Sequence, residues 1–285
     1  MMTAQIINGK EVAEQIRGEL IPRVETLKGK GVEPGLAAVM VGEDPGAQSY
    51  LKGIAKGCEK VGVYTETVSL PEDVSQEKLA QTVEELNDNA KFHGIIIQRP
   101  LPKHINESAI LKLLATEKDV DCLNPISMAK LVSRETDGFA PCTPSAVIEL
   151  LDRYKVEIDG KRVVIVGGAG NIGRTVGIML LNRWATVILC DYKTVEPVAE
   201  YRRAEILVSA VGRAKMVTRD MVSPGTIVID VGVSRGEDGK MSGDADYDEV
   251  SQVAGMITPV PGGVGSVTTT ILLAHTVEAA ERLSK

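Results

Sequence analysis

The chain has 285 residues, of which 44% are hydrophobic and 25% charged, a composition typical of a globular protein with one large or two ordinary domains. A net charge of −7 argues against nucleic acid as the main partner, and no apolar run approaches the roughly 20 residues that span a bilayer. The four cysteines lie far apart and the three histidines form no metal-binding pattern, so we expect no metal site and a reducing, cytoplasmic compartment.

The first half of the chain alternates predicted helices and strands. Apolar residues at helical spacing predict helices over residues 9–28, 47–61, 75–89 and 110–114. Strand-like apolar runs occupy residues 36–41, 63–70 and 94–98. Strands this apolar do not face water, which favours a parallel sheet with helices on both faces.

The middle of the chain has poor periodicity from residue 125 to residue 144, and residues 137–144 are interpreted as a linker. Thr143 and Pro144 then suit the first turn of a helix that runs to residue 151. The alternation resumes with strands over residues 162–166, 185–190, 205–210 and 226–231, and with helices over 172–181 and 268–283. The whole pattern predicts an α/β protein.

A nucleotide-binding motif follows the strand at residues 162–166. Gly168, Gly170 and Gly173 fit G-x-G-x-x-G between a strand and a helix, and Asp191 closes the next strand about 20 residues on. The glycines permit a tight turn, and the helix N-terminus offers N–H groups to a pyrophosphate. The candidate cofactor-binding residues are Gly167, Gly168, Ala169, Gly170, Asn171, Ile172, Gly173, Asp191, Gly212 and Val233.

Asp191 bears on the choice between the two nicotinamide dinucleotides. Its carboxylate can accept hydrogen bonds from ribose hydroxyls and would repel a 2′-phosphate, which favours NAD over NADP. Lys193 lies two residues on and could meet a phosphate, so NADP stays the less favoured alternative.

Three other stretches carry candidate site residues. Gln98 ends the strand at 94–98, and Asp121 lies in Lys118-Asp119-Val120-Asp121. The ends of buried parallel strands face the ligand-binding crevice of open α/β sheets, but the pattern alone favours a solvated loop position for both residues. Thr258 to Gly265 contains two prolines and three glycines, which predicts a rigid loop with exposed amides and neither helix nor strand.

With these motifs the chain resembles the methylenetetrahydrofolate dehydrogenase/cyclohydrolase (FolD-type) family over nearly its full length. The resemblance rests on Tyr50 with Lys56, on residues 94–102 (GIIIQRPLP), on 118–121, 141–144 and 229–232, and above all on 258–265 (TPVPGGVG). It implies a homodimer of subunits with two α/β domains flanking a cleft. Residues 1–140 would form a folate-binding domain, with the helix at 268–285 packing back on it, and residues 141–267 a Rossmann NAD-binding domain.

The resemblance also implies residue roles. Tyr50 would stack over the folate, and Gln98 and Asp121 would act with it in catalysis and substrate binding, with Asp121 holding the pterin. Lys56 matches the family's second lysine and is a weaker catalytic candidate. Pro261, Gly262, Gly263 and Gly265 would line the folate and nicotinamide side.

Three departures from the family pattern refine the expected activity. Ile54 stands where the family has a lysine that handles protons in the cyclohydrolase reaction, and neither Lys52 nor Lys56 lies on the same helical face. Gly167-Gly168-Ala169 and Asp191-Tyr192-Lys193 replace segments that usually engage the phosphate of NADP. Ser266-Val267 also differs from the family pattern, with no clear effect.

These features predict oxidation of 5,10-methylenetetrahydrofolate to 5,10-methenyltetrahydrofolate with NAD, with cyclohydrolase activity absent or weak and supplied by a separate enzyme. A bifunctional NADP-dependent dehydrogenase/cyclohydrolase is the alternative. A folate- or nucleotide-binding protein without catalysis is a remote third possibility.

Overall fold

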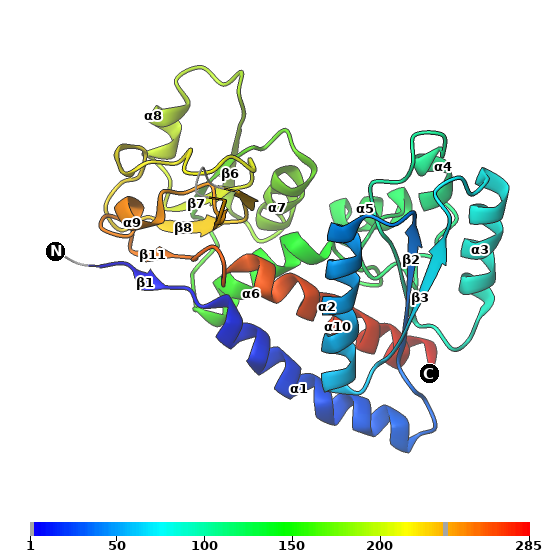
Figure 1. Cartoon of the computed structure of the whole chain (residues 1–285). Helices are drawn as coiled ribbons and strands as arrows, with labels where there is room; N and C mark the ends of the chain where they lie inside the picture. The colour runs from blue at the N-terminus through cyan, green and yellow to red at the C-terminus, as the bar shows by residue number, and fades with distance from the viewer. Residues whose placement is uncertain (1–2, 236–238) are drawn as a thin grey trace. The chain divides into compact units, whose positions relative to one another are not determined.

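The computed structural model describes residues 3–235 and 239–285, and the chain divides into two compact units. One, here called the three-stranded unit, comprises residues 14–142 and 269–285. The other, the six-stranded unit, comprises residues 1–13 and 143–268. Helices α1 (Gly9–Gly29) and α10 (Val264–Leu283) each belong partly to both units (Figure 1).

The three-stranded unit is built on a parallel sheet in the order β3-β2-β4. Its strands are β2 (Gly35–Val41), β3 (Tyr64–Leu70) and β4 (Gly94–Ile97). Its other helices are α2 (Pro45–Val61), α3 (Gln76–Asp88), α4 (Glu107–Leu111) and α5 (Pro125–Val132). Leu79, Val83 and Leu86 of α3 pack on alternate residues of β2 and β4, which gives this sheet face its core.

The six-stranded unit has a sheet in the order β1-β11-β8-β7-β5-β6, with every pair parallel. Its strands are β1 (Gln5–Ile6), β5 (Arg162–Val166), β6 (Thr186–Cys190), β7 (Ile206–Ser209), β8 (Ile227–Asp230) and β11 (Met256–Ile257). Its helices include α6 (Cys142–Arg153), α7 (Asn171–Leu181), α8 (Pro197–Tyr201), α9 (Tyr247–Val250) and the short η1 (Arg219–Met221). A two-stranded ribbon, β9 (Ser234–Arg235) with β10 (Met241–Ser242), completes it.

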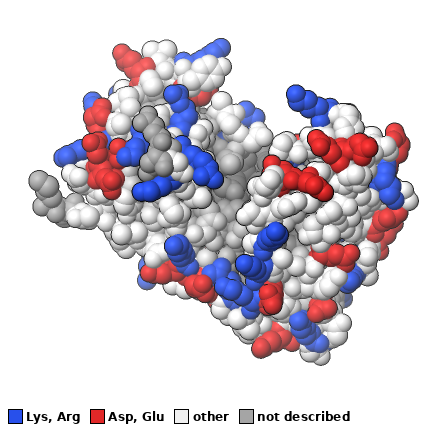
Figure 2. All heavy atoms as spheres, viewed as in Figure 1, with Lys and Arg blue, Asp and Glu red and all other residues white. Residues whose placement is uncertain are grey.

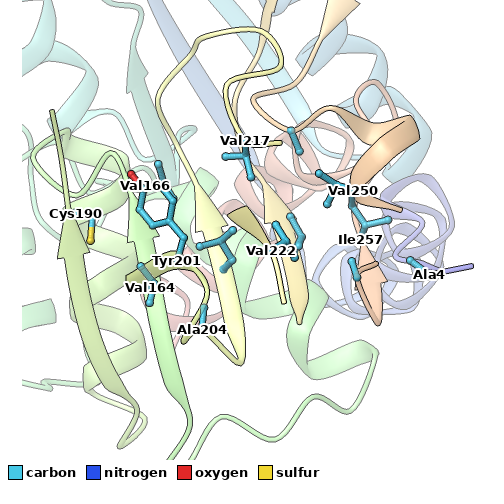
Figure 3. Packing of buried hydrophobic residues seen from close by; sticks show 14 residues of the cluster. Ala4, Val164, Val166, Cys190, Tyr201, Ala204, Val217, Val222, Val250 and Ile257 are labelled. Atoms are coloured by element: carbon cyan, nitrogen blue, oxygen red, sulfur yellow. The ribbon is translucent and has the colours of Figure 1, made fainter. Parts of the chain in front are cut away.

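Aliphatic side chains dominate the core of this unit. Figure 3 shows Val164 and Val166 of β5 beside Tyr201, and Ile257 beside Val250, all buried in one cluster. Burial of both faces explains why these strands read as unbroken apolar runs. The mixed α/β architecture with a parallel sheet therefore confirms the predicted fold class.

The structure corrects several predicted boundaries. The predicted irregular stretch after residue 125 contains helix α5, in which Asn124 accepts a hydrogen bond from the N–H of Ile126 and Pro125 occupies the first turn. Helix α10 begins at Val264, so the last two residues of the predicted loop at 258–265 are helical. Residues 1–13 belong to the six-stranded unit and not to the first domain, because β1 pairs with β11.

No helix among the described residues is both long and apolar enough to cross a membrane. Within the same residues, no cluster of three or more His, Cys, Asp or Glu side chains is suited to hold a metal ion.

Candidate active site

The glycine turn after β5 is sterically closed at three positions. Gly167 has a φ of 89°, and a Cβ there would lie 2.6 Å from the carbonyl oxygen of Ala210. A Cβ on Gly168 would lie 2.6 Å from the Cβ of Leu189, and one on Gly173 would lie 2.4 Å from the oxygen of Gly167. Gly167, which precedes the G-x-G-x-x-G pattern, is thus as constrained as Gly168 and Gly173, whereas a Cβ on Gly170 would lie 3.3 Å from the oxygen of Gly167.

The donors available to an anion lie at the start of α7 and not in the glycine turn itself. The N–H groups of Gly167 and Gly168 both donate to the carbonyl oxygen of Cys190 and are therefore already bonded. The first turn of α7 begins at Asn171, and the first N–H groups of a helix have no partner within it. Arg174 also lies here, with its Nη2 donating to the carbonyl of Ala169 at 2.8 Å. This end of α7 therefore suits a pyrophosphate.

Asp191 follows β6 at the next position along the sheet edge. Its Oδ1 accepts the N–H of Lys193 at 2.7 Å, and its own N–H donates to Thr194 Oγ1 at 2.8 Å. These bonds hold the carboxylate in a fixed turn beside the glycine turn, since the backbone N–H groups of Gly167 and Gly168 reach the residue just before it.

Asp244, a buried residue before α9, holds the loop that follows β7. Its Oδ2 accepts hydrogen bonds from Ser209 Oγ at 2.8 Å and from the N–H of Val211 at 2.7 Å. Its Oδ1 accepts the N–H of Arg213 at 2.8 Å. The bonded residues flank Gly212, so this carboxylate sets the backbone of a predicted cofactor-binding residue.

Asp230, at the end of β8, holds the neighbouring loops. Its Oδ1 accepts the N–H groups of Gly232 and Asp244, and its Oδ2 accepts that of Ala245. Its own N–H donates to Thr258 Oγ1 at 2.7 Å. This bond holds the start of residues 258–263, which we call the proline–glycine loop. Burial raises the pKa of Asp230 to about 6; the charge of Asp244 contributes to the rise, and the backbone N–H donors oppose it.

We call Asp230 and Asp244 the carboxylate clasp. Glycines give it room: a Cβ on Gly232 would lie 2.1 Å from Asp244, and one on Gly243 would lie 2.1 Å from Asp230. Val233, the remaining predicted cofactor residue, lies beyond β8 on this loop and is 57% exposed. Asp230 lies in the 229–232 stretch that supports the family resemblance, but nothing in the sequence indicates its link to Asp244, because a buried acid has no periodic signal.

The proline–glycine loop rests on the start of α1. A Cβ on Gly263 would lie 2.5 Å from the oxygen of Pro259, and one on Gly9 would lie 2.0 Å from the oxygen of Gly263. Gly262 has a φ of 109°, and Gly265 lies in the first turn of α10 with open space around its Cβ position. Gly262 and Gly263, which follow Pro261, therefore occupy positions that only glycine fits without strain.

Tyr50 and Asp121 lie close together in the three-stranded unit. Tyr50, in the second turn of α2, is 39% exposed. Partial burial raises the pKa of its phenol well above the ordinary value, and the nearby charge of Asp121 raises it further. Asp121 Oδ1 accepts the N–H of Cys142 at 2.9 Å. A neutral hydroxyl and a carboxylate are thus near enough in this unit to interact electrostatically.

Gln98 follows β4, where its N–H pairs with the carbonyl of Val39 and its side-chain amide donates to the carbonyl of Arg99 at 3.1 Å. Lys56 lies six residues after Tyr50, about 9 Å along α2 and about 120° around it, in a cavity with Arg17 and Lys60. The structure therefore brings Tyr50 and Asp121 together and places Lys56 elsewhere.

Ile54 is 1% exposed and belongs to the buried stripe of α2, which consists of Leu51, Ile54, Cys58 and Val61. This spacing is that of a helix face packed on a core. The position one turn after Tyr50 is therefore apolar in its surroundings as well as in its side chain.

Comparisons with known proteins match both units. Residues 7–121 match the tetrahydrofolate dehydrogenase/cyclohydrolase catalytic domain, and residues 141–284 match the NAD(P)-binding domain of the same family. The chain is 48% identical over 281 residues to the bifunctional protein FolD of Bacillus cereus strain B4264, covering 99% of this chain and 98% of that protein.

Two solved structures resemble this chain over nearly its full length. The bifunctional FolD enzyme from Campylobacter jejuni is 41% identical, with a TM-score of 0.96 over 98% of this chain and 99% of that one. The Trypanosoma brucei methylenetetrahydrofolate dehydrogenase-cyclohydrolase, solved with NADP and an inhibitor, is 38% identical, with a TM-score of 0.93 over 100% of both chains.

Proposed function

Because the chain belongs to the tetrahydrofolate dehydrogenase/cyclohydrolase family, we propose that it oxidises 5,10-methylenetetrahydrofolate by hydride transfer to a nicotinamide dinucleotide. The observation that carries this proposal within the fold is the pairing of Tyr50 with Asp121. An intact glycine turn at α7 supports the dinucleotide half of the reaction and argues against a binding protein without catalysis.

The chemistry fits these groups. Loss of a hydride from the one-carbon bridge leaves a cationic methenyl group, and an aromatic ring stacked over it stabilises that charge. Tyr50 would supply the ring and a hydroxyl that stays protonated at neutral pH. The carboxylate of Asp121 would accept hydrogen bonds from the amino group and ring N–H of the pterin. Gln98 would add an amide at the end of β4.

The second reaction, hydrolysis of the methenyl product, distinguishes two candidates. The names of the Bacillus and Campylobacter relatives favour a bifunctional enzyme. Ile54 favours a dehydrogenase alone, because an isoleucine cannot move a proton and this position is buried among apolar residues. We propose that hydrolysis by this chain is weak and that a separate enzyme completes it, while the relatives support the bifunctional alternative.

One cuvette assay separates the candidates. Dinucleotide reduction and methenyltetrahydrofolate accumulation are followed together after addition of methylenetetrahydrofolate. A dehydrogenase alone gives the two in equal amounts, whereas a bifunctional enzyme gives reduced dinucleotide without lasting methenyl product. Ile54→Lys should then gain hydrolysis, with Ile54→Leu as the size-matched control. Rapid hydrolysis by the unsubstituted chain would establish the bifunctional reading.

The cofactor is proposed to be NAD. Asp191 would repel a 2′-phosphate, and residues 167–169 carry no basic side chain. The NADP in the Trypanosoma brucei structure favours the other dinucleotide, and Lys193 and Arg174 are the cations available for its phosphate. The measurement is kcat/KM with each dinucleotide, and a preference for NADP would overturn the assignment.

A homodimer is the proposed assembly. In the six-stranded unit, β6 is an edge strand, and Leu181, Trp184 and Leu189 on or near it are 55%, 68% and 47% exposed. Apolar side chains at a sheet edge suit a second copy of the chain. Analytical ultracentrifugation of Leu189→Lys should show monomers if this edge is the interface.

The four cysteines are free thiols, which fits the cytoplasmic location proposed for the enzyme.

A further inference from the structure

His275 lies near the middle of helix α10, in the part of that helix that belongs to the three-stranded unit. Figure 2 shows lysine, arginine, aspartate and glutamate side chains spread over the visible surface, whereas His275 is a partly buried titratable group. Burial lowers the pKa of its imidazole, so the ring is neutral at pH 7. The reaction proposed above uses no histidine.

The ring of His275 is bonded to the backbone next to Asp121. Its Nδ1 lies 2.9 Å from the carbonyl oxygen of Val120. A carbonyl oxygen can only accept a hydrogen bond, so the proton of the neutral ring is on Nδ1 and this nitrogen donates. The carbonyl of Val120 and the N–H of Asp121 belong to one planar peptide group. The bond therefore sets the peptide plane from which the Asp121 side chain departs.

The first residue of α6 bonds to the same two residues. The N–H of Cys142 donates to Asp121 Oδ1 at 2.9 Å, and its thiol donates to the carbonyl oxygen of Val120 at 3.4 Å. That carbonyl has two lone pairs and can accept from both His275 and Cys142. Three hydrogen bonds thus hold the Val120–Asp121 peptide and the carboxylate that follows it.

The chain turns sharply after Asp121. Cys122 has a φ of 53°, a left-handed conformation that is unfavourable for a residue with a Cβ. The carboxylate of Asp119 accepts the N–H groups of Leu123 and Asn124, each at 2.8 Å, on the other side of the turn. Because the turn is unfavourable by itself, it depends on such contacts to keep Asp121 in place.

An aromatic side chain fixes the imidazole in turn. The ring of the buried Phe139 lies 5.1 Å from that of His275 and is inclined to it by 37°. Arg282, about two turns further along α10, has its Cζ 4.7 Å from the centre of the Phe139 ring and donates to the carbonyl of Asp137 at 2.7 Å. The donor on His275 is therefore held in one orientation before any ligand binds.

Resting on the proposed function, we propose that His275 is a positioning residue for substrate binding, whose hydrogen bond to Val120 orients the carboxylate of Asp121 for the pterin of the folate substrate. A neutral ring holds the peptide without placing a positive charge beside Asp121. It therefore does not compete with the amino group of the pterin for that carboxylate.

Three substitutions at position 275 separate the donor from the packing. An asparagine places its amide nitrogen near the position of Nδ1, a glutamine places it one bond farther away, and a phenylalanine has a ring without a donor. His275→Phe and His275→Gln should raise KM for methylenetetrahydrofolate roughly tenfold, whereas His275→Asn should stay within about threefold. KM for the dinucleotide should not change. The value of kcat should change little, because Asp121 binds the pterin equally in the substrate and the transition state.

A second experiment asks whether the effect passes through Asp121. In an Asp121→Ala background, His275→Phe should raise KM for the folate no further, because two residues that act as one unit are not additive. His104→Phe is the matched control, since it removes a bond of the same kind, between Nε2 and the carbonyl of Val74 at 3.0 Å. It should leave KM for both substrates unchanged. Thermal unfolding of each variant measures stability separately.

Three results would make His275 a purely structural residue. They are a rise in folate KM of equal size in the Asp121→Ala background, a loss of stability without any change in folate KM, and a His275→Asn protein as impaired as His275→Phe. If His275→Phe does not fold, the comparison of His275→Asn with His275→Gln decides. If the unsubstituted chain does not oxidise methylenetetrahydrofolate, the proposed function itself fails, whereas oxidation with a KM that is independent of position 275 removes only this inference.

Discussion

Replacement of Asp244 by asparagine is a direct test of the carboxylate clasp. The aspartate accepts three hydrogen bonds from the β7 loop, two on Oδ2 and one on Oδ1. The amide oxygen of an asparagine can keep the two bonds to Ser209 and Val211, but its NH₂ group then faces the N–H of Arg213. Two hydrogen-bond donors then face each other, so the loop loses the bond that holds the N–H of Arg213, directly after Gly212.

The magnitude follows from these contacts. One lost charged hydrogen bond costs about 2 kcal/mol, and two that become neutral lose about 1 kcal/mol each. Removal of the charge beside Asp230 relieves some repulsion, so the net loss is about 3 kcal/mol. If the dinucleotide must spend half of this free energy to reorder the loop when it binds, its dissociation constant rises roughly tenfold.

Two assays measure the effect. Trp184, the single tryptophan, lies in the six-stranded unit, so its fluorescence during urea unfolding reports this unit. Titration with dinucleotide gives the binding change, while KM for the folate should stay near its original value. Asp248→Asn carries the same charge change at an exposed position and is the control. An Asp244→Asn protein with unchanged stability and dinucleotide affinity would refute the role of the clasp.

Three further substitutions have defined outcomes. The pKa of Asp230, about 6 against an ordinary 3.8, means that the folded chain holds an extra proton between these values. Stability therefore falls by about 3 kcal/mol as pH rises through this window, and urea unfolding of Asp230→Asn should lack that slope. Gly173→Ala, with its Cβ 2.4 Å from an oxygen, should weaken dinucleotide binding at least tenfold, whereas Gly18→Ala, with open space around it, should not. Asp191→Ser should raise the ratio of kcat/KM for NADP to that for NAD about tenfold, and an unchanged ratio would show that Asp191 does not discriminate.

Local sequence determined most of the secondary structure. Parallel strands buried on both faces must be apolar throughout, so β2, β4, β5, β7 and β8 are visible as apolar runs. The glycine motif at residues 168–173 is equally local, because a strand, a turn and a helix start are consecutive in the chain. Helix α5 has no comparable signal, because its eight residues are too few to show a helical period.

Contacts between residues far apart in the chain could not be predicted. Asp230 and Asp244 lie fourteen positions apart and bond to loops from three strands, and no spacing rule connects them. The two-residue strand β1 has no sequence signal, yet its pairing with β11 assigns the N-terminus to the six-stranded unit. Arg17 of α1 and Lys60 of α2 likewise line one cavity only because the two helices pack side by side.

The sequence by itself determined the α/β alternation, the nucleotide turn and the identity of Tyr50, Asp121, Ile54 and Asp191 as informative positions, because each belongs to a contiguous motif. Tertiary structure alone decided that Asp121 lies near enough to Tyr50 to affect its pKa, that Ile54 is a core residue, and that Lys56 lines a cavity. The physical reason is that helix and strand periods follow from neighbouring residues, whereas burial and charge pairing depend on which faces the packed elements present to each other.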